Sequence, residues 1–152
     1  MSATDSRAVA FEDALVDALQ INEGLAGVQV EIGPLGDYTA KRESIQFFGC
    51  RAEEEWTALG NARRDETLTL RGSLFVDVPG GSVNQAVRTA SARAWQLRNI
   101  VAAQLRSDPK VGGTVYAAGI VRSEERRGLN PDGSRRSTIE FEIQARATLP
   151  RA

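Results

Sequence analysis

The sequence predicts an α+β fold in which an antiparallel or mixed sheet of about four to five strands carries one long and one shorter helix packed on one face. Two kinds of pattern support this. A long helical periodicity covers Ser82 to Ser107, and several segments alternate apolar and polar residues with a period of two. These strand-like segments occur in groups rather than alternating with helices. With 152 residues, the chain is predicted to form a single domain over 1–152, with a flexible N-terminus.

Two elements are predicted before residue 33. A helix over Ala8 to Gln20 has Thr4, Asp5 or Ser6 as candidate caps, and we expect it to pack beside the long helix. A strand follows over Val28 to Ile32, where apolar and polar residues alternate. The polar and glycine-containing stretch near 33–43 then predicts a long loop.

The middle of the chain predicts three strand segments. The first contains Ile45 and Phe47 and ends near Gly49, whereas Arg51 to Leu59 fits either a strand or a helical turn, of which we favour the strand. The clearest strand is Thr67 to Val78, whose apolar residues share one face. Gly72 interrupts that face, which indicates a bulge or a close approach of the backbone.

The predicted long helix begins at Ser82, which forms a capping-box pattern with Gln85, and it ends before Asp108-Pro109. Its apolar residues recur at steps of three and four, so they predict a face that packs on the core. This face comprises Val83, Ala86, Val87, Ala90, Ala94, Leu97, Val101 and Leu105. A helix of this length is about 37 Å long and must lie across a sheet or a neighbouring element.

Two strands are predicted after the long helix. Thr114 to Arg122 is partly apolar on both faces, which is typical of a strand that is central in the sheet or lies at an interface. Thr138 to Leu149 alternates regularly between apolar and polar residues. Between them, the polar segment 123–137 contains the turn sequence Asn130-Pro131-Asp132-Gly133 and predicts a hairpin with a long loop at its tip.

Composition limits the possible functions. The formal net charge of −1 argues against direct, sequence-specific nucleic-acid binding, because such binding depends on neutralising phosphates. The chain has no histidine and a single cysteine, Cys50, so we expect no metal site, and any catalysis would have to rest on carboxylate, lysine, tyrosine or serine side chains. Because these residues form no recognisable catalytic constellation, we expect no cofactor and no enzymatic activity. No apolar stretch is long enough to predict a membrane span, and the N-terminal residues do not resemble a secretory signal.

Several residues are candidates for contacts with partners. Arginines gather near the predicted hairpin tip, which is either a solvated loop with compensating charges or a docking loop. Trp95 projects off the apolar face of the long helix, where it is either covered by the N-terminal helix or acts as an interface anchor, and Trp56 allows the same two interpretations. The full candidate set is Trp56, Arg63, Arg64, Trp95, Tyr116, Arg126, Arg127, Arg135 and Arg136.

Two further patterns predict no site. Pro79-Gly80-Gly81-Ser82 precedes a helix but lacks the lysine and the spacing of a phosphate-binding loop, so it predicts a turn. The acidic run Glu53 to Glu55 has no partner constellation for acid–base chemistry, and we interpret it as a solvated or pore-facing charge run.

The order of these elements and several soft motifs resemble a known group of proteins. The motifs are the segment from Cys50 to Gly60, the segment from Arg63 to Leu70, the helix after Pro79-Gly80-Gly81, and Asp108-Pro109 with Gly112-Gly113. From about Val28 to Leu149, the chain resembles small tail proteins of actinobacterial siphophages and is most similar to the tail terminator, or tail-completion, proteins.

This resemblance implies a structural virion protein that is made in the host cytoplasm. Such a protein forms a homo-oligomeric ring, usually a hexamer, on the head-proximal end of the tail, where its partners are the tail tube protein and the head connector or stopper protein. A different head-to-tail joining protein, such as a stopper, is an alternative that sequence patterning does not separate from a terminator. A small ligand-binding or hydrolytic domain of the hot-dog type is the alternative from another functional class.

Overall fold

The computed structural model describes residues 5–33, 42–56, 63–80 and 82–150. Within these ranges, the helices are α1 (Ala8–Gln20), the short 3-10 helix η1 (Glu23–Leu25) and α2 (Val83–Ser107). The strands are β1 (Gln29–Ile32), β2 (Glu43–Trp56), β3 (Arg63–Val78), β4 (Ala117–Leu129) and β5 (Arg135–Pro150). The expected flexible N-terminus and most of the expected loop near 33–43 lie outside the described residues.

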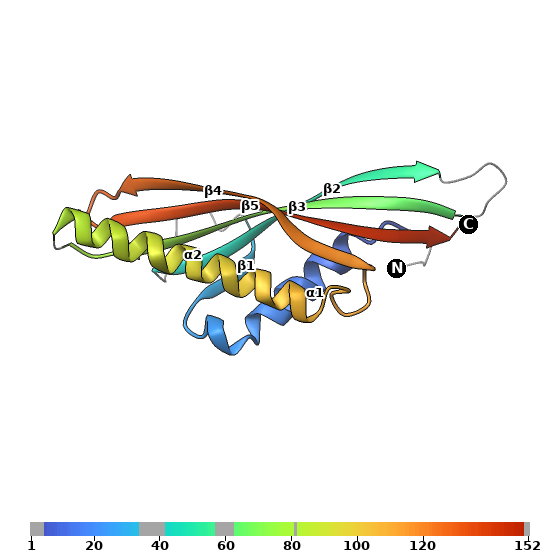
Figure 1. Ribbon diagram of the computed structural model, residues 1–152, viewed down its shortest axis with the longest axis horizontal. Helices are drawn as coiled ribbons and strands as arrows, with labels where there is room; N and C mark the ends of the chain where they lie inside the picture. The colour runs from blue at the N-terminus through green and yellow to red at the C-terminus, as the bar shows by residue number, and fades with distance from the viewer. Residues whose placement is uncertain (1–4, 34–41, 57–62, 81, 151–152) are drawn as a thin grey trace.

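The strands form one mixed sheet in the order β1-β2-β3-β5-β4. Only β1 and β2 are parallel, and the other neighbouring pairs are antiparallel. Both helices lie on the same face of this sheet, and α2 begins near the β4–β5 turn and runs along the strands away from it (Figure 1). The predicted α+β class and the placement of the helices are therefore confirmed.

The long helix packs on the sheet through the face that its periodicity predicts. Buried positions recur along α2 at Ala86, Ala90, Ala94, Leu97, Val101 and Leu105. Ser82 Oγ accepts a hydrogen bond from Gln85 N at 3.3 Å, which confirms the predicted cap. Val87 of the predicted face is only half-buried, and Val83 is an exception, since 54% of it is exposed. It occupies the first helical turn, near the end of the sheet, so the apolar face is shorter than the periodicity predicts.

Gly72 marks a close approach in the core. It lies on β3 directly between Phe47 of β2 and Phe141 of β5 in the strand register. The two phenylalanine rings meet edge to face with their centroids 5.8 Å apart. A Cβ atom on Gly72 would lie 2.4 Å from Cζ of Phe141, so the missing side chain provides the space that the aromatic pair fills.

The N-terminal helix is held by contacts from distant strands. α1 packs mainly on β2 and β1. The backbone N–H of Arg7 donates to Oε1 of the fully buried Glu66 on β3 at 2.8 Å, so a carboxylate from another element lies at the positive end of the helix dipole. The expected packing of α1 beside α2 is limited to a small contact. Just after α1, Asn22 Nδ2 donates a hydrogen bond to Gln104 Oε1 of α2 at 2.9 Å.

The predicted loop over 123–137 is wrong, because most of this segment is strand. β4 continues to Leu129 and β5 begins at Arg135, and their residues remain paired from Arg122 and Glu142 to Leu129 and Arg135. The turn itself is short, with hydrogen bonds from Gly133 N to Asn130 O and from Asn130 N to Ser134 O. Polar residues extend these strands at little cost because one face of the sheet is not covered by a helix, so side chains on that face reach solvent.

Of the two positions expected for the strand over Thr114 to Arg122, central in the sheet or at an interface, the central one is wrong. The strand begins at Ala117 and becomes β4, which lies at an edge of the sheet and pairs only with β5 in the described part of the chain. The central strands are β3 and β5. Segments 45–49 and 51–56, predicted as separate strands, form the single strand β2 with a bulge between Phe47 and Cys50. Residues 57–59 of the predicted second segment lie outside the described residues.

Candidate interaction surfaces

The sheet has two different free edges. On one side, β4 has no strand beyond it among the described residues. On the other side, β1 pairs only with Ser44 to Phe47 of β2. The far half of β2, Cys50 to Trp56, pairs with β3 but has no strand on its outer side within the described ranges. Strand edges with unpaired backbone groups are templates for pairing with another chain.

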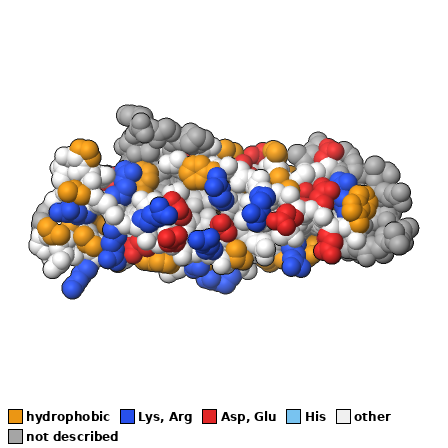
Figure 2. Space-filling model, turned by 90° about the horizontal axis from the view of Figure 1, so that it is seen from above, with side chains coloured by type: hydrophobic (Ala, Val, Ile, Leu, Met, Phe, Trp, Pro, Cys, Tyr) orange, Lys and Arg blue, Asp and Glu red, His pale blue; other side chains and the backbone are white. Residues whose placement is uncertain are grey.

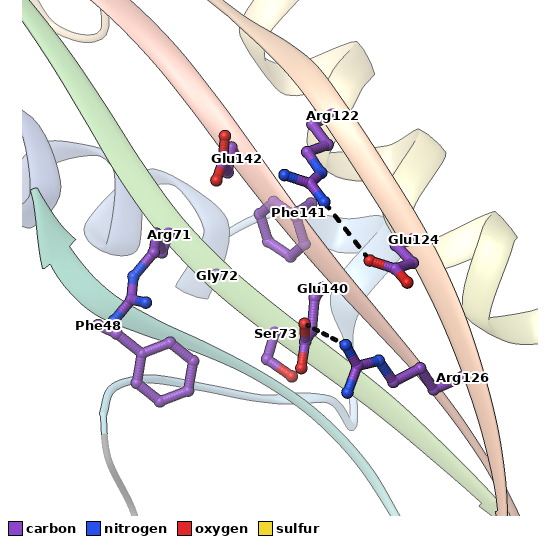
Figure 3. Close-up of a pocket in the computed structure, with 10 residues that line it drawn as sticks. All are labelled: Phe48, Arg71, Gly72, Ser73, Arg122, Glu124, Arg126, Glu140, Phe141 and Glu142. Carbon is purple, nitrogen blue, oxygen red and sulfur yellow. Dashed lines mark ion pairs between the residues drawn. The ribbon is translucent and has the colours of Figure 1, made fainter.

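The sheet face opposite the helices is covered with charges of both signs. Figure 2 shows basic and acidic side chains interspersed along this face. A depression of about 430 Å³ lies near its middle, between β2 and β4 (Figure 3). Three arginines and three glutamates line it, together with Phe48, Gly72, Ser73 and Phe141. The six charged residues are Arg71, Arg122, Arg126, Glu124, Glu140 and Glu142.

The charges in this depression compensate one another. Arg122 lies 3.7 Å from Glu124, and Arg126 lies 3.9 Å from Glu140, as the dashed lines in Figure 3 show. Equal numbers of both signs favour a mixed-charge contact surface over a pocket for one anion or one cation. Among the described residues, no cluster of three or more aspartate, glutamate or cysteine side chains has the geometry to hold a metal ion.

The four candidate arginines of the hairpin do not form one cluster. They are on strands, where successive side chains point to opposite faces of the sheet. Arg126 and Arg136 therefore lie on the charged face, whereas Arg127 and Arg135 lie on the face that carries α2. A single arginine-rich docking loop is not present in the described structure.

Arg136 is part of the packing of this end of the sheet. Its Nε and Nη2 atoms donate to the two carboxylate oxygens of Asp77 at 2.7 and 2.9 Å. Its guanidinium carbon also lies 4.0 Å from the ring centroid of the buried Phe75. The hydrogen bond to Asp77 raises the pKa of the Arg136 guanidinium above its ordinary value. The bidentate geometry and the stacking indicate a structural role.

We expect Arg136→Ala to lower the free energy of unfolding by about 1–3 kcal/mol, because Asp77 loses a bidentate partner and Phe75 loses its cover. Arg126→Ala is the matched control, since Arg126 is exposed on the same face and its nearest carboxylate oxygen is 3.9 Å away. We expect that control to change stability by less than about 0.5 kcal/mol. Urea unfolding followed by circular dichroism measures both, and equal values for the two variants would contradict the structural role.

Arg127 belongs to a polar cluster that joins β4 to α2. Glu125 accepts a hydrogen bond from Ser137 at 2.6 Å and forms an ion pair with Arg127 at 3.1 Å, and Arg127 also donates to Ser91 on α2 at 3.4 Å. Burial raises the pKa of Glu125, but the hydrogen bonds from Ser137, Ser91 and Arg127 outweigh this effect and hold it below its ordinary value. The carboxylate therefore stays charged and links the two elements.

Trp95 lies on the flank of α2 that faces β4. It is half-buried and packs against the core, so it is not the exposed anchor that the sequence allows. Ser91 and Arg98, one turn before and after it, both bond to β4 residues, and Arg98 Nε donates to Ser123 Oγ at 3.1 Å. The neighbouring contacts thus place this flank at the edge strand.

The remaining candidate contact residues lie away from this flank of α2. Trp56 ends β2, is 60% exposed, and has the guanidinium carbon of Arg64 5.9 Å from its ring centroid. Arg63 pairs with Pro150 in the strand register, and its side chain lies outside the described structure. Tyr116 is exposed just before β4, and its N–H donates to Arg146 O. At about 3.3 Å per residue, Trp56 and the arginines of the hairpin lie about 40 Å apart along the sheet.

Cys50 is a half-buried thiol beside α1. Its Sγ atom lies 3.9 Å from the carbonyl oxygen of Ala8. Burial raises the pKa of this thiol to about 12, and the carboxylates of Glu12 and Glu66 add to the effect. The thiol therefore remains protonated at physiological pH, and the thiolate is the reactive form.

We expect Cys50 to react with iodoacetamide at pH 8 at least about a hundredfold more slowly in the folded protein than in urea, where its pKa returns to about 8.5. The rate in the folded protein should still increase between pH 9 and pH 11, where the rate in urea has reached its plateau. Mass spectrometry of timed samples measures both rates. Similar rates at pH 8 would contradict the raised pKa.

Comparison with models of known protein families finds no family that matches this chain, and comparison with curated proteins finds no match either. None of the helices in the described ranges is long and apolar enough to cross a membrane.

Proposed function

We propose that this chain is a structural virion protein that forms a ring on the head-proximal end of a siphophage tail tube and joins the tube to the head connector. The resemblance to tail terminator proteins provides the class. The observation that carries the proposal is that two different edges, on opposite sides of one sheet, have no further strand beside them in the described part of the chain. A ring of identical subunits needs two different complementary surfaces on each subunit.

The remaining surfaces are available for the tube and the connector. The helix-free face of the sheet carries both signs of charge, which is suited to specific polar contacts with other proteins. Trp56 at one end of the sheet and Leu129 at the other are both exposed. In this proposal, the protein has no catalytic role, and its partners are other copies of itself, the tail tube protein and the connector or stopper protein.

The hot-dog alternative has less support. It requires a pocket in which acid and base groups converge beside the long helix. The depression in Figure 3 lies on the face of the sheet away from α2, and four of its six charged side chains form two ion pairs, Arg122 with Glu124 and Arg126 with Glu140. We therefore favour a structural protein over a hydrolytic one.

Light scattering coupled to size-exclusion chromatography, followed by negative-stain imaging with purified siphophage tail tubes, tests this function. We expect discrete oligomers, usually hexamers, or rings that bind one end of the tubes. Attachment to tube ends supports a terminator, whereas binding only to the head connector supports a stopper. A protein that remains monomeric at high concentration and in the presence of tube ends would overturn the proposal.

A further inference from the structure

We propose that neighbouring subunits join edge to edge, with β4 of one copy pairing antiparallel to the far half of β2 of the next copy. The inference rests on the proposed ring and specifies its contact. The predicted partner surface is the segment Cys50 to Trp56, and the pairing segment on β4 is Ala118 to Glu125, with Val121 as the extra residue of the bulge between Ile120 and Arg122. Five-stranded sheets would then continue from one subunit to the next.

The orientation of the two edges permits this pairing. β2 is antiparallel to β3, β3 is antiparallel to β5, and β5 is antiparallel to β4, so β4 runs antiparallel to β2 within one subunit. A rotation about an axis along the strands brings β4 of one copy beside β2 of the next and preserves this relation. It also keeps the helix-covered faces on the same side, so the two edges meet as a continuous sheet.

Existing contacts of β2 with β1 and α1 limit the segment of β2 that is free to pair with another subunit. On β2, the neighbouring strand β1 covers the segment up to Phe47, and the N–H of Gly49 donates to Glu12 Oε2 of α1 at 2.8 Å. The free segment therefore begins at Cys50. Its residues from Arg51 to Trp56 are exposed.

The charges select one register. Arg51 and Glu53 on β2 form an ion pair at 3.2 Å, and Arg122 and Glu124 on β4 form one at 3.7 Å. All four side chains are exposed and lie on the sheet face opposite the helices. Antiparallel pairing with Ser123 opposite Ala52 places Arg122 opposite Glu53 and Glu124 opposite Arg51. Opposite charges in directly opposed positions stabilise strand pairs.

Neighbouring registers are disfavoured. Side chains must remain on their own face, so the register can shift only in steps of two residues. One step in one direction places Arg122 opposite Arg51. One step in the other direction places Glu124 opposite Glu53 and Arg126 opposite Arg51, and these two like-charge pairs outweigh the single opposite-charge pair of Arg122 with Glu55. Like charges directly opposite each other destabilise strand pairs. The exposed charges therefore specify the register as well as the partner edge.

The test exchanges the charges on one edge at a time. The β2 variant carries Arg51→Glu with Glu53→Arg, the β4 variant carries Arg122→Glu with Glu124→Arg, and a third variant combines all four substitutions. We expect each single-edge variant to lose the ring peak in light scattering, with subunit association at least about tenfold weaker, because both cross-strand pairs become like-charged. The four-fold variant restores opposite charges at both positions, so we expect it to recover the ring.

This design separates the competing contacts. If β4 paired with β4 of another copy, exchanging both charges on β4 would leave Arg and Glu opposite each other, and assembly would persist in the β4 variant. The control variant carries Arg71→Glu with Glu142→Arg on the central strands, which face the same side but lie away from both edges. Loss of the ring in this control, or persistence of the ring in the single-edge variants, would overturn the proposed edge-to-edge contact. Neither result would contradict the proposal that the protein forms a ring. A parent protein that forms no ring would overturn the proposed function.

Discussion

Leu97→Asp is expected to unfold the protein or to lower its free energy of unfolding by at least about 4 kcal/mol. Leu97 is fully buried in the middle of α2, within the cluster formed by the helices and the inner face of the sheet. The substitution removes the packing of the leucine and places a carboxylate in an apolar environment, where it must either lose its charge or open the core to water. Urea unfolding monitored by circular dichroism measures the change.

Val83→Asp is the matched control, because it introduces the same charge into the same helix at a position that is 54% exposed. An acidic side chain in the first turn also interacts favourably with the helix dipole. We therefore expect this variant to remain within about 1 kcal/mol of the parent. If Leu97→Asp unfolded at the same urea concentration as Val83→Asp, the assignment of the core-facing side of α2 would be wrong.

Gly72→Ala is expected to destabilise the protein by about 1–3 kcal/mol, although alanine is normally tolerated at least as well as glycine in a strand. The new methyl group would lie 2.4 Å from Cζ and 2.7 Å from Cε2 of Phe141. This ring is itself buried and meets Phe47 edge to face, so it has little room to move. The strain is therefore distributed to the aromatic pair or to the backbone of β3.

A double-mutant cycle identifies the cause. Phe141→Leu alone should also destabilise the protein, because it removes part of a buried ring. The combination of Gly72→Ala and Phe141→Leu should cost less than the sum of the two single changes, since the smaller side chain makes room for the methyl group. Additive losses measured by denaturant unfolding would show that the effect of Gly72→Ala does not depend on the Phe141 ring.

Local pattern in the sequence was sufficient to predict the elements that form the core. The boundaries of α2 followed from Ser82 and from Asp108-Pro109, and its buried side followed from the spacing of its apolar residues. The inner faces of β3 and β5 followed from strict alternation, and the interruption at Gly72 correctly indicated a close approach. These features are encoded within one or two helical turns or a few strand residues, so they can be read without knowledge of the partners.

The positions and contacts of the surface side chains could be determined only from the tertiary structure. The polarity of 123–137 suggested a loop, because polar residues occur both in loops and on strands whose sides face solvent. Only the pairing of β4 with β5 showed that Arg126 and Arg136 lie on one face and Arg127 and Arg135 on the other. The contacts of Arg136 with Asp77 and with the ring of Phe75 likewise join residues about 60 positions apart in the chain, so local sequence pattern could not predict them.

The order of strands was also decided by long-range pairing. The two partly apolar faces of Thr114 to Arg122 suggested a central strand or an interface strand. β3 and β5 occupy the centre, and β4, to which most of this segment belongs, lies at the edge. The sequence by itself determined which residues of β3 and β5, and of α2 apart from its first turn, face the core, because that depends on local periodicity. The tertiary structure alone decided which strands are neighbours and which edges remain free, because these depend on hydrogen bonds between segments that are distant in the chain.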